Sequence, residues 1–264
     1  ATALIGFIYS QTTRTPKILK DYGMLTVNGF FFGIAMASFF EPSMELYAYL
    51  LIGALAVPFV TKAAYEVLQH WKLSPFIIPY ILVVWVFILS ANAMAFNILP
   101  EPELLKKTFA LVYEYNNSAI CFNILHTIFV SIGLIFFLPS AFFGFALLVL
   151  VSAFSPRQGF FMLAGTAVAV LVGYVLMSQF HTDIGLSQYS YSAGLVGIGL
   201  ASFPEKFKVQ TLLLFCVVSL FLTIAASQLL VQLGLPVLSL PYVMTMWVAI
   251  LSRVPKLNVN WAQQ

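Results

Sequence analysis

Charged side chains are scarce in this chain of 264 residues. Lysine and arginine number 12 and aspartate and glutamate 9, together 8% of the chain, whereas 61% of the residues are hydrophobic and the mean hydropathy is +0.98. A water-facing surface needs far more charge than this, so the composition excludes a soluble globular protein. The chain has a net charge of +3 but no long basic run, so we expect no nucleic-acid partner.

Titratable side chains are almost absent from the apolar segments, and this excludes most kinds of site chemistry. His126 is the only histidine well inside such a segment, and no histidine pair has metal-ligand spacing. No Ser-His-Asp order, glycine-rich phosphate loop or paired carboxylate occurs within a span, so we expect neither an enzyme nor a cofactor nor a metal site. An intramembrane enzyme using His126 or His181 is the least favoured alternative. Cys121 and Cys216 lie in apolar segments and are expected to be buried thiols.

Long intervals without charge fill most of the chain. About 20 apolar residues suffice for one helical crossing of a bilayer, and each interval is long enough for one or two. The intervals run from 21 to 41, 45 to 62, 72 to 101, 114 to 157, 157 to 181, 183 to 205 and 208 to 253. The fold class predicted is an all-α integral membrane protein, expected in the cell membrane.

The chain contains an internal repeat. The segment GIAMASF at 33–39 returns as GIGLASF at 197–203, and a Pro-Tyr pair with tryptophan six residues after the proline occurs at 79–85 and again at 241–247. Two matches in the same order predict two related halves, 1–107 and 108–264. The first half is expected to be incomplete at its N-terminus, because part of the second half has no counterpart in it.

Loop charges predict how the halves are oriented. Loops with lysine or arginine are 10–21, 62–72 and 205–208, whereas 41–45 and 181–183 contain neither. The positive-inside rule places the first group in the cytoplasm, and the two halves then have opposite orientations, so the repeats are inverted. Membrane proteins built from inverted repeats commonly place their binding site where the halves meet.

This orientation requires that the interval 124–156 enters the bilayer and returns on the same side. Pro139 and Ser140 at its centre are the expected break, because proline cannot donate a backbone hydrogen bond. Re-entrant backbone at membrane depth is tolerated where it is packed in protein or lines a polar path. The pattern therefore predicts a re-entrant pair of short helices beside a central pore. A proline-kinked full span is the alternative.

Two further breaks lie at equivalent places in the halves. The segment GLPVLSLPY at 234–242 contains two prolines five residues apart, and LSPFIIPY at 73–80 keeps the double break. Such segments cannot be continuous helix and leave carbonyl groups free to accept hydrogen bonds from a solute. Ser239 in the second break is matched by Ile77 in the first. The aromatic and hydroxylic residues of the apolar segments suit a small, flat, neutral solute better than an ion.

Around these breaks the chain resembles the urea transporter family, whose two repeats each carry a YNGxLVG-type helix and an LPxxTxPF-type break. The segment 235–242 matches the second motif, with serine for threonine and tyrosine for phenylalanine. The segments 27–33 and 191–197 are similar to the two copies of the first motif, and 132–144 has the layout of the family's half-helix, GxGQVxFQNNxxTG. The resemblance extends over most of the chain from Tyr22 onward.

The resemblance implies a homotrimer that passes urea down its gradient, with one pore per subunit on the pseudo-two-fold axis and with the lipid bilayer as its surroundings. By position, the pore would be lined by nine residues of the two halves. They are Phe31 and Leu195 at the narrow slot, Val27 and Tyr191 one turn away, Ile135 and Phe137 from the half-helix, Ser239 as the central hydroxyl, and Ile77 and Leu134 beside them.

Two of these residues depart from the family pattern and leave the solute open. Ile77 replaces a central threonine, and Leu134 replaces a glutamine or glutamate that would accept from the solute. Removing water from an amide without compensating hydrogen bonds costs about 2 to 7 kcal/mol. The prediction is a passive channel for urea or a similar small neutral amide. Alternative solutes are ammonia, water or a short alkyl amide, and a non-conducting receptor or scaffold is the alternative class.

Overall fold

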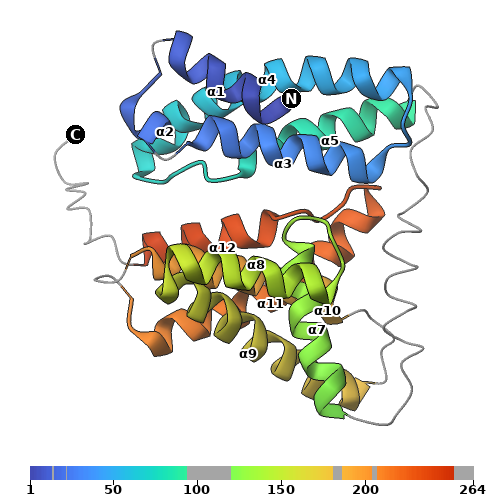
Figure 1. Cartoon of the computed structure of the whole chain (residues 1–264), viewed down its shortest axis with the longest axis vertical. Coiled ribbons are helices and arrows are strands. Elements are labelled where there is room, and N and C mark those ends of the chain that lie inside the picture. Colours follow the sequence, from blue (N-terminus) through green and yellow to red (C-terminus); the bar gives the residue numbers. More distant parts are fainter. Residues whose placement is uncertain (14, 22, 94–119, 181–185, 204–206, 253–264) are drawn as a thin grey trace, which may run out of the picture.

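The computed structural model describes residues 1–252 except 14, 22, 94–119, 181–185 and 204–206 (Figure 1). The described residues form helices and no strand. The helices are α1 (Thr2–Thr12), α2 (Lys17–Asp21), α3 (Met24–Phe39), α4 (Met44–Leu68), η1 (Gln69–Trp71), α5 (Ile78–Ala93), α7 (Ile120–Leu134), α8 (Ala141–Phe154), α9 (Pro156–Phe180), α10 (Leu186–Ala201), α11 (Val209–Gln232) and α12 (Leu240–Leu251).

The helices form two groups that lie one above the other in Figure 1. In the first group α1 packs on α3 and α4, and α5 also packs on both of these helices. In the second group α9 packs on α10 and α11, while α7 contacts α8, α9 and α10. The groups, which we call the first and the second half, contact each other through α5 and α12. We call this contact region the seam.

Among the described residues, three helical stretches are long and apolar enough to cross a membrane by length and composition. They are Met44–Trp71, Pro156–Leu176 and Val209–Leu230, with mean hydropathies of 1.6, 2.1 and 2.3. At a rise of 1.5 Å per residue, the shortest of them extends over about 31 Å, the thickness of a bilayer's hydrocarbon core. The prediction of an all-α membrane protein is thus confirmed. The boundary predicted between the halves, at 107, lies outside the described residues.

Helix is interrupted at each of the three places predicted from proline. Helix α7 ends at Leu134 before α8 begins at Ala141, η1 ends at Trp71 before α5, and α11 ends at Gln232 before α12. Each interruption contains a non-glycine residue with positive φ, namely Phe137 (59°), Phe76 (44°) and Leu238 (48°). These left-handed residues turn the chain, so the carbonyl groups on either side of each break do not continue a helical ladder.

Helices α7 and α8 pack tightly against each other on either side of the Pro139 break. They contain 15 and 14 residues, which is about 21 to 23 Å each and less than a full hydrocarbon thickness. Small residues allow the close approach, since a Cβ at Gly144 would overlap the carbonyl of Phe129 and one at Gly133 would overlap that of Leu138. Two short helices joined by a break are the geometry expected of the re-entrant pair.

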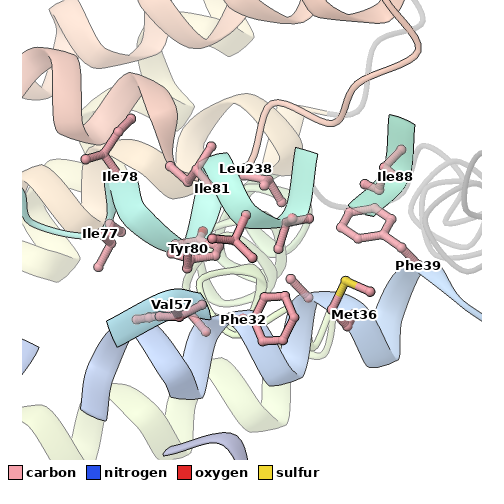
Figure 2. Close-up of a cluster of buried hydrophobic side chains, with 14 of the residues drawn as sticks. Phe32, Met36, Phe39, Val57, Ile77, Ile78, Tyr80, Ile81, Ile88 and Leu238 are labelled. Carbon is pink, nitrogen blue, oxygen red and sulfur yellow. The ribbon is translucent and has the colours of Figure 1, made fainter. Parts of the chain in front are cut away.

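The core of the first half reaches across the seam. Figure 2 shows Phe32 and Met36 of α3 and Val57 of α4 on one side of α5, whose Tyr80 and Ile81 are fully buried. Leu238, from the break before α12, belongs to the same cluster and lies beside Ile81 and Tyr80. The second-half break is therefore packed against the first half.

Candidate functional site

Two tryptophans tie the halves together in a reciprocal manner. The indole N–H of Trp85 in α5 donates to the carbonyl of Pro236 at 2.9 Å, and that of Trp247 in α12 donates to the carbonyl of Ser74 at 2.8 Å. Trp85 and Trp247 occupy equivalent places in the sequence repeat, and so do Ser74 and Pro236. Each half thus supplies the donor that satisfies a carbonyl in the break of the other, and both breaks lie at the seam.

Between these bonds, a tyrosine and a serine from opposite halves meet. The hydroxyl of Tyr80 donates to Oγ of Ser239 at 3.0 Å. Both residues are buried, with 0% of Tyr80 and 3% of Ser239 exposed. Tyr80 lies in the first turn of α5, and Ser239 is the residue before α12 begins. This pair brings two hydroxyl groups together at the seam.

Aromatic rings lie directly against this hydroxyl pair. The ring of Phe31 in α3 stacks on Tyr80, with centroids 5.4 Å apart and an angle of 23° between the planes. Phe31 also stacks on Phe136 from the α7–α8 break, at 5.5 Å and 21°, and Phe30 meets Phe136 edge-on. We call Tyr80, Phe31 and Phe136 the ring stack. It combines residues of three elements and both halves.

Asn28 holds the first break in position. Its amide N–H groups donate to the carbonyls of Met24, at 2.8 Å, and Phe76, at 2.9 Å, and its amide oxygen accepts from the backbone N–H of Tyr80 at 3.1 Å. An asparagine can serve both roles because it carries donors and an acceptor on one side chain. The start of α5, and with it the Tyr80 ring, is therefore anchored to α3.

The second break is held by a different side chain. The carbonyl of Leu238, the counterpart of Phe76 in the double-proline segment, accepts a hydrogen bond from the hydroxyl of Tyr191 in α10. Ser192, the counterpart of Asn28 in the repeated helix, bonds to Ser219 and Thr223 of α11 instead. The second break is thus held by Tyr191, one residue before the counterpart of Asn28.

The structure brings some of the predicted site residues to the seam and leaves others at its margin. Phe31, Tyr191 and Ser239 take part in the contacts above, and Ile77, Leu134 and Ile135 are buried. Val27 is 39% exposed, and Leu195 is half-buried against the cluster that contains Ile128, Ile132 and Ile135. Phe137 is half-buried, and its ring meets Phe39 edge-on rather than Phe31.

Sequence reasoning did not name two residues of the ring stack. Tyr80 was visible in the repeated Pro-Tyr pair, but its hydroxyl pairs with Ser239, 159 residues away, and no local pattern signals that contact. Phe136 adjoins the predicted Phe137, and the ring of Phe136 stacks on Phe31, whereas that of Phe137 meets Phe39.

The seam carries hydroxyls, carbonyls and aromatic rings. Within the described part of the chain, no three histidine, cysteine or carboxylate side chains are grouped in a way that could hold a metal ion. His126 is half-buried in α7, and His181 lies outside the described residues. Groups of this kind hydrogen-bond neutral polar molecules, whereas an ion would need charged or densely carbonyl-lined surroundings.

A search of the curated proteins finds no match. The family model described as "Urea transporter" matches residues 1–254, which is nearly the entire chain. Because this match covers far more than half of the chain, and the helical membrane fold agrees with it, the chain belongs to the urea transporter family.

Proposed function

We propose that the protein is a passive channel for urea or a similar small neutral amide, and that the solute passes along the seam between the halves. The observation that carries the proposal is the Tyr80–Ser239 hydroxyl pair, which is buried between the halves and flanked by the ring stack. Rings accept the flat faces of a planar solute, and the hydroxyl and carbonyl groups replace the water that its edge loses.

The energetics favour a solute with both donors and an acceptor. Removing an amide group from water without compensation costs about 2 to 7 kcal/mol, whereas an amide that exchanges its bonds to water for bonds to protein gains about 0.5 to 1.5 kcal/mol net for each bond. Bonds to Ser239 and to the remaining lone pairs of the break carbonyls, which already accept bonds from the protein, would avoid much of that cost. A passive channel needs no stronger binding of its solute, since binding that is too strong would slow release.

The reciprocal tryptophan bonds support the proposal that the halves are inverted repeats. An axis that exchanges Trp85 with Trp247 also exchanges Ser74 with Pro236, as their equivalent places in the sequence repeat require. Phe76 and Leu238, which both have positive φ, are equivalent in the same way. The path would then coincide with this axis. A homotrimer in the cell membrane, with one path per subunit, completes the proposal.

The proposal is tested in proteoliposomes exposed to a urea gradient, with vesicle volume followed by stopped-flow light scattering. Ser239→Ala is expected to lower urea permeability about fivefold, the factor for one neutral hydrogen bond of about 1 kcal/mol. Ser38→Ala is the matched control, since that hydroxyl bonds to the Ile34 carbonyl of its own helix. Wild-type permeability no greater than that of empty vesicles, with folded protein present, would refute the channel.

A non-conducting scaffold is the second candidate. The observation in its favour is the burial of the hydroxyl pair, since 0% of Tyr80 and 3% of Ser239 are exposed in this conformation. A solute reaches the pair only when side chains around it move. The same vesicle assay separates the two candidates, because a scaffold gives no urea flux under any gradient.

A further inference from the structure

The chain lacks a hydroxyl at one of the two equivalent break positions, yet two hydroxyls still meet at the seam. Ser239 has one, whereas its counterpart Ile77 has none. We infer that Tyr80 supplies the second hydroxyl of the solute site in place of the one that Ile77 lacks. This inference rests on the proposed channel function and adds to it a residue that contacts the solute directly.

Position along the helix makes the replacement possible. Ile77 directly precedes α5 and Tyr80 is three residues further on, and both side chains are buried in the same hydrophobic cluster. Ile77 is buried, and the longer side chain of Tyr80 carries its hydroxyl to within 3.0 Å of Ser239. The hydroxyl therefore comes from Tyr80, about one helical turn beyond Ile77, but it reaches the same seam.

The hydrogen-bonding capacity of the pair fits an amide group. Tyr80 donates to Ser239, so the serine's own hydrogen is free to donate, and it has no acceptor among the described residues. The tyrosine oxygen retains lone pairs that can accept. The pair therefore presents one donor and one acceptor side by side. A carbonyl oxygen and an N–H of the same amide match both, whereas an apolar solute matches neither.

The Tyr80 hydroxyl is held in place from several directions. The backbone N–H of Tyr80 is bonded to Asn28, its ring stacks on Phe31, and its hydroxyl is bonded to Ser239. Phe136 in turn stacks on Phe31 and supports it. A group fixed in this way loses little further freedom when it binds a solute, which favours rapid binding and release.

Tyr242 provides a natural comparison within the same chain. In the repeated Pro-Tyr pair it occupies the position in α12 that Tyr80 occupies in α5, but the residue that corresponds to Ser239 in the opposite half is Ile77. The ring of Tyr242 meets Phe76 edge-on, and its hydroxyl makes no hydrogen bond within the described part of the chain. A tyrosine ring is therefore common to both halves, while the paired hydroxyl occurs only at Tyr80.

Four proteins reconstituted in vesicles test the inference: wild type, Tyr80→Phe, Tyr242→Phe and the double variant Tyr80→Phe with Ile77→Thr. Tyr80→Phe keeps the ring and is expected to lower urea permeability by about 3- to 10-fold, the factor for one neutral hydrogen bond. Tyr242→Phe is expected to stay within about twofold of wild type, since no hydrogen bond is lost. The threonine of the double variant returns a hydroxyl to the seam and is expected to restore permeability.

The outcomes separate this inference from the proposed function. A loss in Tyr80→Phe that Ile77→Thr repairs, with Tyr242→Phe unaffected, supports it. Unchanged or increased permeability in Tyr80→Phe, with a conducting wild type, overturns it while leaving the channel intact. A loss that Ile77→Thr does not repair assigns Tyr80 to holding the halves together and also overturns it. A wild type without urea flux refutes the channel itself, and the inference falls with it.

Discussion

Replacing Trp85 or Trp247 by phenylalanine is expected to destabilise the protein by the same amount. Each indole N–H closes one of the two reciprocal bonds across the seam, to Pro236 at 2.9 Å and to Ser74 at 2.8 Å. Phenylalanine keeps an aromatic ring but has no N–H, so one carbonyl oxygen at the seam loses its donor. If the halves are related by a two-fold axis, the two substitutions remove equivalent hydrogen bonds.

The magnitude follows from the burial of the groups involved. A neutral hydrogen bond contributes about 0.5 to 1.5 kcal/mol, and a buried acceptor left without a partner costs about 1 to 3 kcal/mol. Both tryptophans are half-buried, which places the expected loss at about 1 to 2 kcal/mol each. The bonds share no residue, so the double variant is expected to lose the sum of the two, about 2 to 4 kcal/mol.

The free energy of unfolding is measured by denaturant titration in mixed micelles and followed by far-ultraviolet circular dichroism, because fluorescence would change with each tryptophan removed. Trp71→Phe is the matched control, since Trp71 is 59% exposed in η1, and a change within about 0.5 kcal/mol is expected. Single variants that differ from each other by more than about 1 kcal/mol, or that both behave like Trp71→Phe, would refute the reasoning.

Two further substitutions test how the breaks and the helix pair are held. Asn28→Ala removes three hydrogen bonds, to Met24, Phe76 and Tyr80, and is expected to cost about 2 to 4 kcal/mol in the same titration; a loss below about 1 kcal/mol would contradict it. Gly144→Ala places a Cβ on the carbonyl of Phe129 and is expected to cost about 1 to 3 kcal/mol by forcing α7 and α8 apart, whereas an unchanged midpoint would show that the helices can separate freely.

Much of the architecture could be predicted from local features of the chain. The double-proline segments at 75–79 and 236–241 and the break at Pro139 were expected to interrupt helix, and the structure is interrupted at all three, while the single Pro58 is accommodated within α4. The choice of Ser239 and Phe31 as pore-lining residues came from the family motifs, and both are buried at the seam. The opposite orientation of the halves and the roles of the predicted pore residues in conduction stay predictions.

The details of the site could not be predicted in the same way. Phe137 was expected to line the pore from the half-helix, and in the structure the neighbouring ring of Phe136 stacks on Phe31 while that of Phe137 meets Phe39. Tyr191 was expected near the slot, and its hydroxyl bonds to the Leu238 carbonyl, while the adjacent Ser192 bonds to α11. Such outcomes depend on distances between helices, which sequence patterns do not contain.

By itself, the sequence determined that this is a helical membrane protein with an uncharged interior and where its helices break. The cost of burying charge and the missing N–H of proline act within a few adjacent residues, so neither needs a partner elsewhere. Only the tertiary structure decided which groups meet at the seam. The bonds from Trp85, Tyr80 and Trp247 join residues 151, 159 and 173 positions apart, and such pairs come together only when both halves have folded and docked.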